Sequence, residues 1–225
     1  MFPKNIYMCH KELTFITIYS KFWKNLNPEY EIHLYDNELC EKFLFKEFGK
    51  MHQDIFRFIP DGPIKADFWR ICILFKNGGV YVDSDIEPLV PLREFIDDDV
   101  ELSTCISYYD GYNPHFIVCN AGNELLKKYI YTYLDLYVSR TVYEYWKWSI
   151  CKIFSIPELN DKKSDGVYMI KDKKYILLKE HHGSGYYDNH CVYREIRVFN
   201  NRYGTYNSES HCFFTENPYY FSKPV

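Results

Sequence analysis

Residues 65–85 of this 225-residue chain read KADFWRICILFKNGGVYVDSD. Residues 64–76 form a mostly apolar run of helical length, and Asn77-Gly78-Gly79 supplies the left-handed stop that often ends a helix. Val80-Tyr81-Val82 then reads as a short buried strand, and Asp83-Ser84-Asp85 follows it directly. The stretch therefore predicts a helix, a stop and a strand, with an acidic pair at the carboxyl end of that strand.

The residues before this stretch alternate between strand and helix in the same way. Residues 6–9 read as a strand, and apolar residues recur at helical spacing from 15 to 26. Residues 31–36 alternate like a second strand, and Asn37 is placed to cap a helix that ends at Gly49. Strands that alternate with helices of this length predict an α/β fold with a Rossmann-like, mostly parallel sheet flanked by helices.

Beyond the acidic pair the pattern is less regular. We expect strands over 101–107 and 116–119, helices over 125–137 and 142–154, and a hairpin that pairs 167–170 with 175–178. A tail rich in Gly, His and Tyr follows. Neither a repeat nor a linker interrupts the sequence, and its length suits one hydrophobic core, so a single domain over 1–225 is expected.

Composition excludes several classes of protein. The formal net charge is −4 and no cluster of Lys and Arg stands out, so a nucleic-acid partner is not expected. No run approaches the ~20 apolar residues that cross a bilayer, and the opening residues lack a signal peptide, so no membrane segment is expected. The eight cysteines are scattered without a C-x-x-C pair, which argues against a zinc ribbon or a redox motif. A reducing, cytoplasmic location fits best.

Asp83 and Asp85 are the strongest candidates for chemistry. Two carboxylates two residues apart point to the same side of an extended chain, and ligands of open α/β sheets bind outside the carboxyl ends of the strands. Like charges held close resist ionisation unless a cation lies between them, and Mn²⁺ or Mg²⁺ takes such oxygen ligands together with substrate phosphates. The alternative is a pair of solvated acids in a strand-to-loop turn.

The residues around the pair carry a resemblance. Residues 65–85 resemble the signature of the DXD sugar-transferase family, which includes fungal initiating mannosyltransferases, bacterial glycan transferases and, more distantly, the glucosylating domains of clostridial toxins. Residues 3–7 and 27–31 also lie where the family has its first two elements, so the resemblance covers residues 3–90. It implies a GT-A fold and a glycosyltransferase that moves a sugar from a nucleotide-diphosphate sugar, UDP- ahead of GDP-, to a glycan or other hydroxyl acceptor.

The same resemblance implies roles for particular residues. Asp67 and Arg70 lie three apart on one helix face and would contact hydroxyls of the donor sugar; the alternative is a surface ion pair. Asp83 would bridge the ribose, the sugar and the metal, and Asp85 would bind the metal directly.

Further donor contacts are implied around these four residues. Tyr81 would pack near the ribose, and Ser84 lies between the two carboxylates. The end of the first strand would line the base, through Met8, Cys9 and His10.

A second candidate region lies at residues 180–186, which read EHHGSGY. They resemble the segment with which related families close the site and supply another metal ligand, although Tyr186-Tyr187 stands where a Trp is usual. His182 is our candidate for that ligand, and imidazole suits Mn²⁺ better than Mg²⁺. The alternative is a Gly-rich surface loop with exposed histidines.

The sequence does not decide whether the sugar transfer inverts or retains the configuration at the anomeric carbon. An inverting enzyme needs a base for the acceptor hydroxyl, and Asp110 is our candidate; a retaining enzyme, as the resembled family mostly is, needs none. Two other functions are possible from the sequence. One is a haloacid-dehalogenase-like phosphatase, although the motif of that class follows the first strand and has Thr or Val where this chain has Glu87. The other is an inactive sugar-binding protein on the same fold. The resemblance favours a bacterial or large-DNA-virus glycan pathway, in the host cytoplasm if the protein is virus-encoded.

Overall fold

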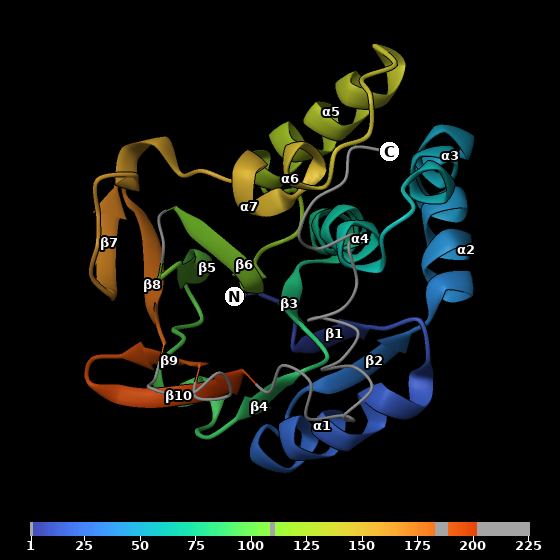
Figure 1. Ribbon diagram of the computed structural model, residues 1–225. Coiled ribbons are helices and arrows are strands. Elements are labelled where there is room, and N and C mark those ends of the chain that lie inside the picture. Colours follow the sequence, from blue (N-terminus) through green and yellow to red (C-terminus); the bar gives the residue numbers. More distant parts are fainter. Residues whose placement is uncertain (1, 109–110, 183–188, 202–225) are drawn as a thin grey trace.

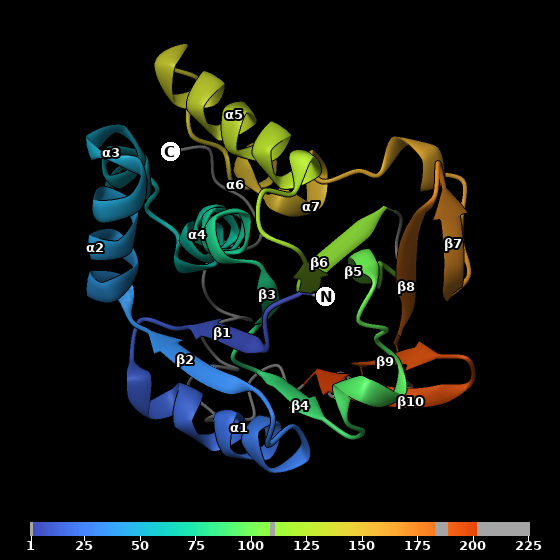
Figure 2. The ribbon, with the colours of Figure 1, turned by 180° about the vertical axis from the view of Figure 1, so that it is seen from behind.

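The computed structural model describes residues 2–108, 111–182 and 189–201. In these parts, helices and strands form a mixed α/β arrangement around one curled sheet (Figures 1 and 2). The predicted α/β class is confirmed. None of the helices in these ranges combines the length and the hydropathy that a bilayer crossing requires.

The first part of the chain alternates strand and helix as predicted. Its elements in chain order are β1 (Asn5–Cys9), α1 (Leu13–Leu26), β2 (Glu31–Tyr35), α2 (Asn37–Phe48), α3 (Lys50–Phe58), α4 (Gly62–Asn77) and β3 (Gly79–Val82). Strand β1 lies between β2 and β3 and is parallel to both. This part of the sheet is therefore the parallel, Rossmann-like portion that the sequence predicts.

The rest of the described chain contributes mostly antiparallel strands. Its elements are β4 (Ile86–Pro88), β5 (Val100–Ile106), β6 (Tyr112–Cys119), α5 (Glu124–Val138), α6 (Tyr145–Trp148), α7 (Ile150–Ile153), β7 (Gly166–Ile170), β8 (Lys173–His181), β9 (Asn189–Tyr193) and β10 (Ile196–Asn201), with short 3-10 turns at Leu92–Glu94 and Pro157–Leu159. The strand order is β2-β1-β3-β6-β5-β8-β9-β10-β4, with β7 on β8. Only β5 and β8 add a further parallel pair among these strands, so the sheet as a whole is mixed.

Two apolar cores lie on opposite faces of the sheet. Alternation along the strands sorts the side chains, because neighbouring residues of a strand point to opposite faces. Tyr7 and Tyr81 belong to the core under α4 and α5, whereas Ile6, Val80 and Val82 belong to the core with α1 and β10. Figure 2 shows α4 and α5 on one side of β3 and β6, and α1, β9 and β10 on the other.

Three details of the predicted elements need correction. Asp36 rather than Asn37 caps α2, since its side chain accepts a hydrogen bond from the backbone N–H of Leu39 at 2.8 Å. The helix expected over 142–154 is two short helices, because Ser149 has extended backbone angles between them. Strands β4, β9 and β10 and helix α3 were not predicted.

Candidate active site

The acidic pair lies in a tight turn rather than in extended chain. Strand β3 ends at Val82, and the backbone N–H of Asp83 donates to the carbonyl of His115 on β6 at 2.9 Å. The N–H of Ile86 then donates back to the carbonyl of Asp83 at 3.2 Å, and β4 begins at that residue. The turn therefore keeps both carboxyl groups at the carboxyl end of β3 by folding the chain back.

Arg70 connects helix α4 to this turn. Its guanidinium lies 3.0 Å from a carboxylate oxygen of Asp67 and 3.0 Å from Oδ1 of Asp83, and it donates to the carbonyl of Pro114 at 2.6 Å. Helix α4 brings Asp67 and Arg70 to one face because they are three residues apart. With 4% of Arg70 and 6% of Asp67 exposed, the pair is buried, so the surface ion pair considered as an alternative is wrong.

Asp67 also holds the start of α7. Its Oδ2 accepts the backbone N–H of Ile150 at 3.0 Å, which is one of the donors that a helix leaves without an internal partner. Burial raises the pKa of Asp67 to about 6, while Arg70 acts in the opposite direction. The carboxyl group thus links α4 to α7 beside the turn.

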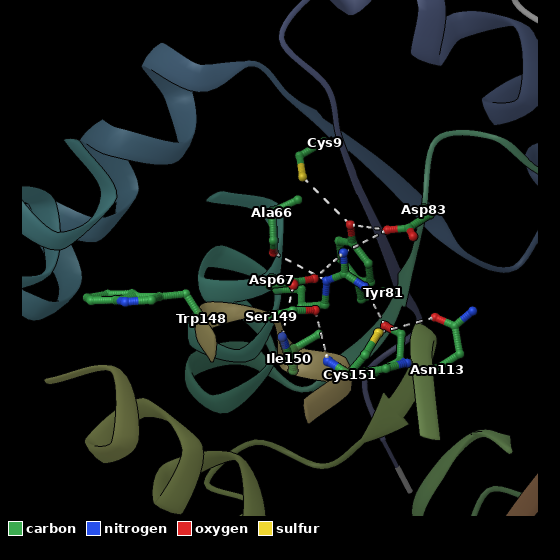
Figure 3. A network of polar contacts seen from close by, with 12 residues as sticks. Cys9, Ala66, Asp67, Tyr81, Asp83, Asn113, Trp148, Ser149, Ile150 and Cys151 are labelled. Carbon is green, nitrogen blue, oxygen red and sulfur yellow. Dashed lines mark hydrogen bonds and ion pairs between the residues drawn. The ribbon is translucent and has the colours of Figure 1, made fainter. Parts of the chain in front are cut away.

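Tyr81, on β3, also binds the carboxylate of Asp83. Its hydroxyl donates to Oδ1 of Asp83 at 2.6 Å, and Arg70 packs over its ring with the guanidinium carbon 4.5 Å from the ring centre. The Cys9 sulfur lies 3.8 Å from the same hydroxyl. Figure 3 shows Cys9, Tyr81 and Asp83 in one connected network. One oxygen of Asp83 is therefore held by two donors, from different elements of the fold.

Asp85 is the more buried member of the pair, with 8% of the residue exposed. Burial and then the charge of Asp83 raise its pKa to about 7, because both favour the neutral acid. Asp67 and Asp83 pair with the guanidinium of Arg70, and the charge of His115 acts on Asp85. When all three carboxyl groups are ionised, they carry more negative charge than Arg70 and a protonated His115 neutralise together, and a divalent cation would neutralise the rest.

The other predicted site residues lie at different distances from this network. The side chain of Met8 is fully buried in the core beside α1. His10, just past β1, shares a hydrogen bond with the backbone of Glu12, and Ser84 lies in the turn itself. Among the described residues, His182 does not form a three-ligand cluster with Asp83 and Asp85; it stacks on Tyr108, with ring centres 4.4 Å apart. Asp110 lies outside the described residues, as do residues 183–186 of the predicted closing segment.

Two buried polar residues near the turn had no predicted role of their own, although Glu180 lies in the 180–186 segment that the sequence singles out. His115 is 2% exposed, and its carbonyl accepts the N–H of Asp83. Glu180 is 3% exposed and accepts hydrogen bonds from the Tyr108 N–H at 3.2 Å and from Asn113 at 3.1 Å. A polar residue inside an apolar strand is the signal that marks both, because such residues are buried only with partners.

Comparison with known proteins shows a similarity in sequence over the region that contains the acidic pair. Residues 16–102 match the family described as "Glycosyltransferase sugar-binding region containing DXD motif". The chain is 35% identical over 105 residues to the initiation-specific alpha-1,6-mannosyltransferase of Candida albicans, a match that covers 42% of this chain and 27% of that protein. The enzyme of the same name from Schizosaccharomyces pombe is 31% identical over 83 residues, covering 35% and 21%. The chain thus matches about a quarter of the length of these relatives.

Two solved structures match this chain at lower sequence identity than these relatives do. The PaToxG glycosyltransferase has a TM-score of 0.49 and 15% identity, covering 62% of this chain and 63% of that one. The galactosyltransferase LgtC, solved with donor and acceptor sugar analogues, has a TM-score of 0.40 and 12% identity, covering 62% and 66%. The sequence match therefore carries the assignment: residues 16–102 are similar to the DXD-containing sugar-binding region of glycosyltransferases, and Asp83-Ser84-Asp85 is the D-x-D sequence within it.

Proposed function

We propose that the protein is a metal-dependent glycosyltransferase of GT-A type. It transfers a sugar from a nucleotide-diphosphate sugar, UDP- ahead of GDP-, to a glycan or another hydroxyl acceptor. The observation that carries the proposal is the burial of Asp85 beside Asp83 at the carboxyl end of β3. Two adjacent acids in that position are costly without a cation, and this edge of an α/β sheet is where ligands bind.

The donor set suits a hard divalent cation. Carboxylate oxygens are the ligands that Mg²⁺ and Mn²⁺ prefer, with substrate phosphates and waters in the other positions. Asp83 and Asp85 are the proposed ligands. When bound, the cation supplies positive charge for the departing nucleotide diphosphate.

The chain's own residues orient the two ligands. Arg70 and Tyr81 both hold Oδ1 of Asp83, which leaves the other oxygen of that carboxylate to face a cation. Asp67 keeps Arg70 in place through their 3.0 Å ion pair. We infer that Arg70 and Asp67 are positioning residues for Asp83, and their direct contact with donor hydroxyls stays a prediction.

The phosphatase and the inactive sugar-binding protein are each distinguished from the glycosyltransferase by a different observation. A haloacid-dehalogenase-like phosphatase has its acidic motif after the first strand, whereas Asp83 here follows the third strand of the chain, β3. An inactive sugar-binding protein would bind a donor without breaking it. Hydrolysis of the donor in the absence of acceptor separates that case from the enzyme.

The proposed cellular location rests on the cysteines being unpaired thiols. The seven cysteines in the described part of the chain are all free thiols, and five of them are buried. Free buried thiols are typical of reducing compartments. We propose a cytoplasmic protein, in the host cytoplasm if a virus encodes it.

The decisive experiment is a panel of UDP- and GDP-sugars with Mn²⁺, Mg²⁺ or EDTA, read out by thermal shift and by release of nucleotide. We expect stabilisation by one class of nucleotide sugar only when metal is present, with slow hydrolysis of the sugar. Asp85→Asn should lose both effects, while Asp161→Asn, at an exposed acid with a side chain 75% exposed, should keep both. A shift of equal size in EDTA would refute the proposed metal dependence.

A further inference from the structure

Three buried side chains, two from consecutive strands and one from much later in the chain, meet near the acidic turn. The sulfur atoms of Cys105 and Cys191 lie 3.4 Å apart, and the Cys191 sulfur lies 3.3 Å from Nε2 of His115. One ligand atom from each of the three residues lies within 4.8 Å of the other two. All three residues are buried, with 0%, 0% and 2% exposed. Among the described residues this is the only cluster of three or more His, Cys, Asp or Glu side chains so close together.

The sheet assembles the cluster from three different strands. Cys105 lies on β5 and His115 on the next strand, β6, whereas Cys191 lies on β9, 76 residues after His115 in the chain. Strands β5 and β6 pair with each other, and β8 joins β5 to β9. The absence of a C-x-x-C pair, which argues against a zinc ribbon, therefore does not exclude a thiolate site built by the fold.

The spacing of the three atoms fits a tetrahedral zinc ion. Zinc binds Cys sulfur at about 2.3 Å and His nitrogen at about 2.0–2.1 Å, so tetrahedral angles place two sulfurs about 3.8 Å apart and a sulfur and nitrogen about 3.6 Å apart. The observed 3.4 and 3.3 Å are shorter by a few tenths of an ångström. A small outward movement of each side chain makes room for the ion.

Hydrogen bonding leaves the imidazole incompletely satisfied. Nδ1 of His115 is buried and has no hydrogen-bond partner among the described residues. A buried polar atom without a partner costs free energy. Zinc on Nε2, the ring nitrogen beside Cys191, would fix the ring proton on Nδ1 and would not give that proton an acceptor, so the proposal rests on the spacing of the three ligand atoms.

We propose that Cys105, His115 and Cys191 bind one zinc ion as a structural site, distinct from the cation site at Asp83 and Asp85. Zinc binding releases the two thiol protons to solvent, and two thiolates neutralise the charge of the ion. Glu180 lies directly opposite Cys191 in the β8–β9 pair, so both side chains are on the same face, and its carboxylate would have to move toward the three ligand atoms to take the fourth position. Soft thiolate ligands favour zinc here, whereas the oxygen ligands of the acidic turn favour Mn²⁺ or Mg²⁺.

The test uses the full chain, purified with a non-thiol reductant and dialysed against a buffer with nanomolar free Zn²⁺. We expect one zinc per chain by elemental analysis, and less than a fifth of that in Cys105→Ser and Cys191→Ser. Cys72→Ser replaces a buried cysteine outside the cluster and should keep one zinc. Asp85→Asn should keep one zinc as well, which separates this site from the proposed catalytic cation. Glu180→Gln should bind zinc more weakly, by tenfold or more.

A second measurement needs no variant, so it holds even where a cysteine variant fails to fold. X-ray absorption of the zinc-loaded wild-type chain should show sulfur neighbours at about 2.3 Å. A wild-type chain that holds no zinc, a shell of oxygen and nitrogen alone, or zinc retained in both cysteine variants would each overturn the proposal. A mass two hydrogens below that of the reduced chain, with Cys105 and Cys191 peptides joined, would overturn it in favour of a disulfide.

Discussion

Arg70 and Asp83 form an ion pair at 3.0 Å between helix α4 and the turn that follows β3, with the side chain of Arg70 buried and that of Asp83 partly exposed. The same guanidinium reaches Asp67 on its own helix and the carbonyl of Pro114 on β6. One side chain therefore connects a helix, the acidic turn and the neighbouring strand. The position of Asp83 is therefore set by this connection together with the turn.

Replacing Arg70 by Met should strongly destabilise the protein. Removing one partner of a buried ion pair leaves an unpaired charge in the core, here that of Asp67, and typically costs about 3–5 kcal/mol. Urea unfolding followed by circular dichroism measures the loss. Arg93→Met is the matched control, because Arg93 is largely exposed and its pairing with Glu29 at 3.5 Å should contribute less than about 1 kcal/mol. Equal losses in the two variants would contradict the role assigned to Arg70.

Tyr81→Phe should separate the orientation of Asp83 from the stability of the fold. The variant loses the hydrogen bond to Asp83 and a weaker one with the Cys9 thiol, so the free energy of unfolding should fall by about 1 kcal/mol. Loss of a group that orients a metal ligand typically weakens metal binding by about 10- to 100-fold. Calorimetric titration with Mn²⁺ measures this. Tyr112→Phe loses a similar bond, to the carbonyl of Leu159, and should keep its Mn²⁺ affinity.

The stability of the metal-free protein should depend on pH through Asp85. Burial and the charge of Asp83 raise the pKa of this carboxyl to about 7, so the folded state binds its proton more tightly than the unfolded state does. Its contribution to stability is therefore fully present below about pH 4, the ordinary pKa of Asp, and is lost as the pH rises through about 7.

Asp85→Asn removes this dependence. In EDTA, we expect the variant to melt above the wild type at pH 8, and the difference to shrink by pH 5, with about 2–4 °C for each kcal/mol of stability. Asp161→Asn should change the melting temperature equally at both values. A difference in melting temperature between Asp85→Asn and wild type that widens toward acid pH would contradict the predicted direction of the pH dependence.

Gly78→Ala should cost more than Gly49→Ala, although both glycines have nearly the same backbone angles. Gly78 has φ 66° and ψ −173°, and Gly49 has φ 86° and ψ −175°, a region that strains other residues by about 1–3 kcal/mol. A Cβ at Gly78 would also lie 2.5 Å from the backbone nitrogen of Ala121, whereas one at Gly49 meets nothing within 4 Å. We expect an additional loss of about 1–3 kcal/mol for Gly78→Ala, from chemical denaturation. Similar losses in both variants would refute the tight contact.

The elements that the sequence predicts well have local signals. Helix α4 and strand β3 combine a long apolar run with a Gly-Gly stop, and both occur where expected. Hairpin β9–β10 was missed because its turn, Arg194-Glu195, has positive φ at both residues without the Gly or Asn that marks such turns. Helix α3 was missed because Gly49 ends α2 and begins α3 at once, so a stop signal hides a second helix.

The site was predictable only where its residues are close in sequence. Asp83 and Asp85 follow a strand that is easy to recognise, and Asp67 and Arg70 share a helix face. The break at Ser149 was not predictable, because the N–H that it frees at Ile150 is satisfied by Asp67, 83 residues earlier in the chain. His115 and Glu180 reach the turn region through strand pairings, which no local pattern encodes.

Strand β4, which leaves the acidic turn, pairs with β10, the last strand that the structure describes. Its partners there, Phe199, Asn200 and Asn201, are more than a hundred residues later in the chain. During synthesis, domains fold as the chain emerges. Nearly all of the described chain must therefore be synthesised before β4 can pair with β10. A nascent chain arrested before β10 should already contain Asp83 and Asp85 but should not yet have the strand pairing that follows the proposed cation site.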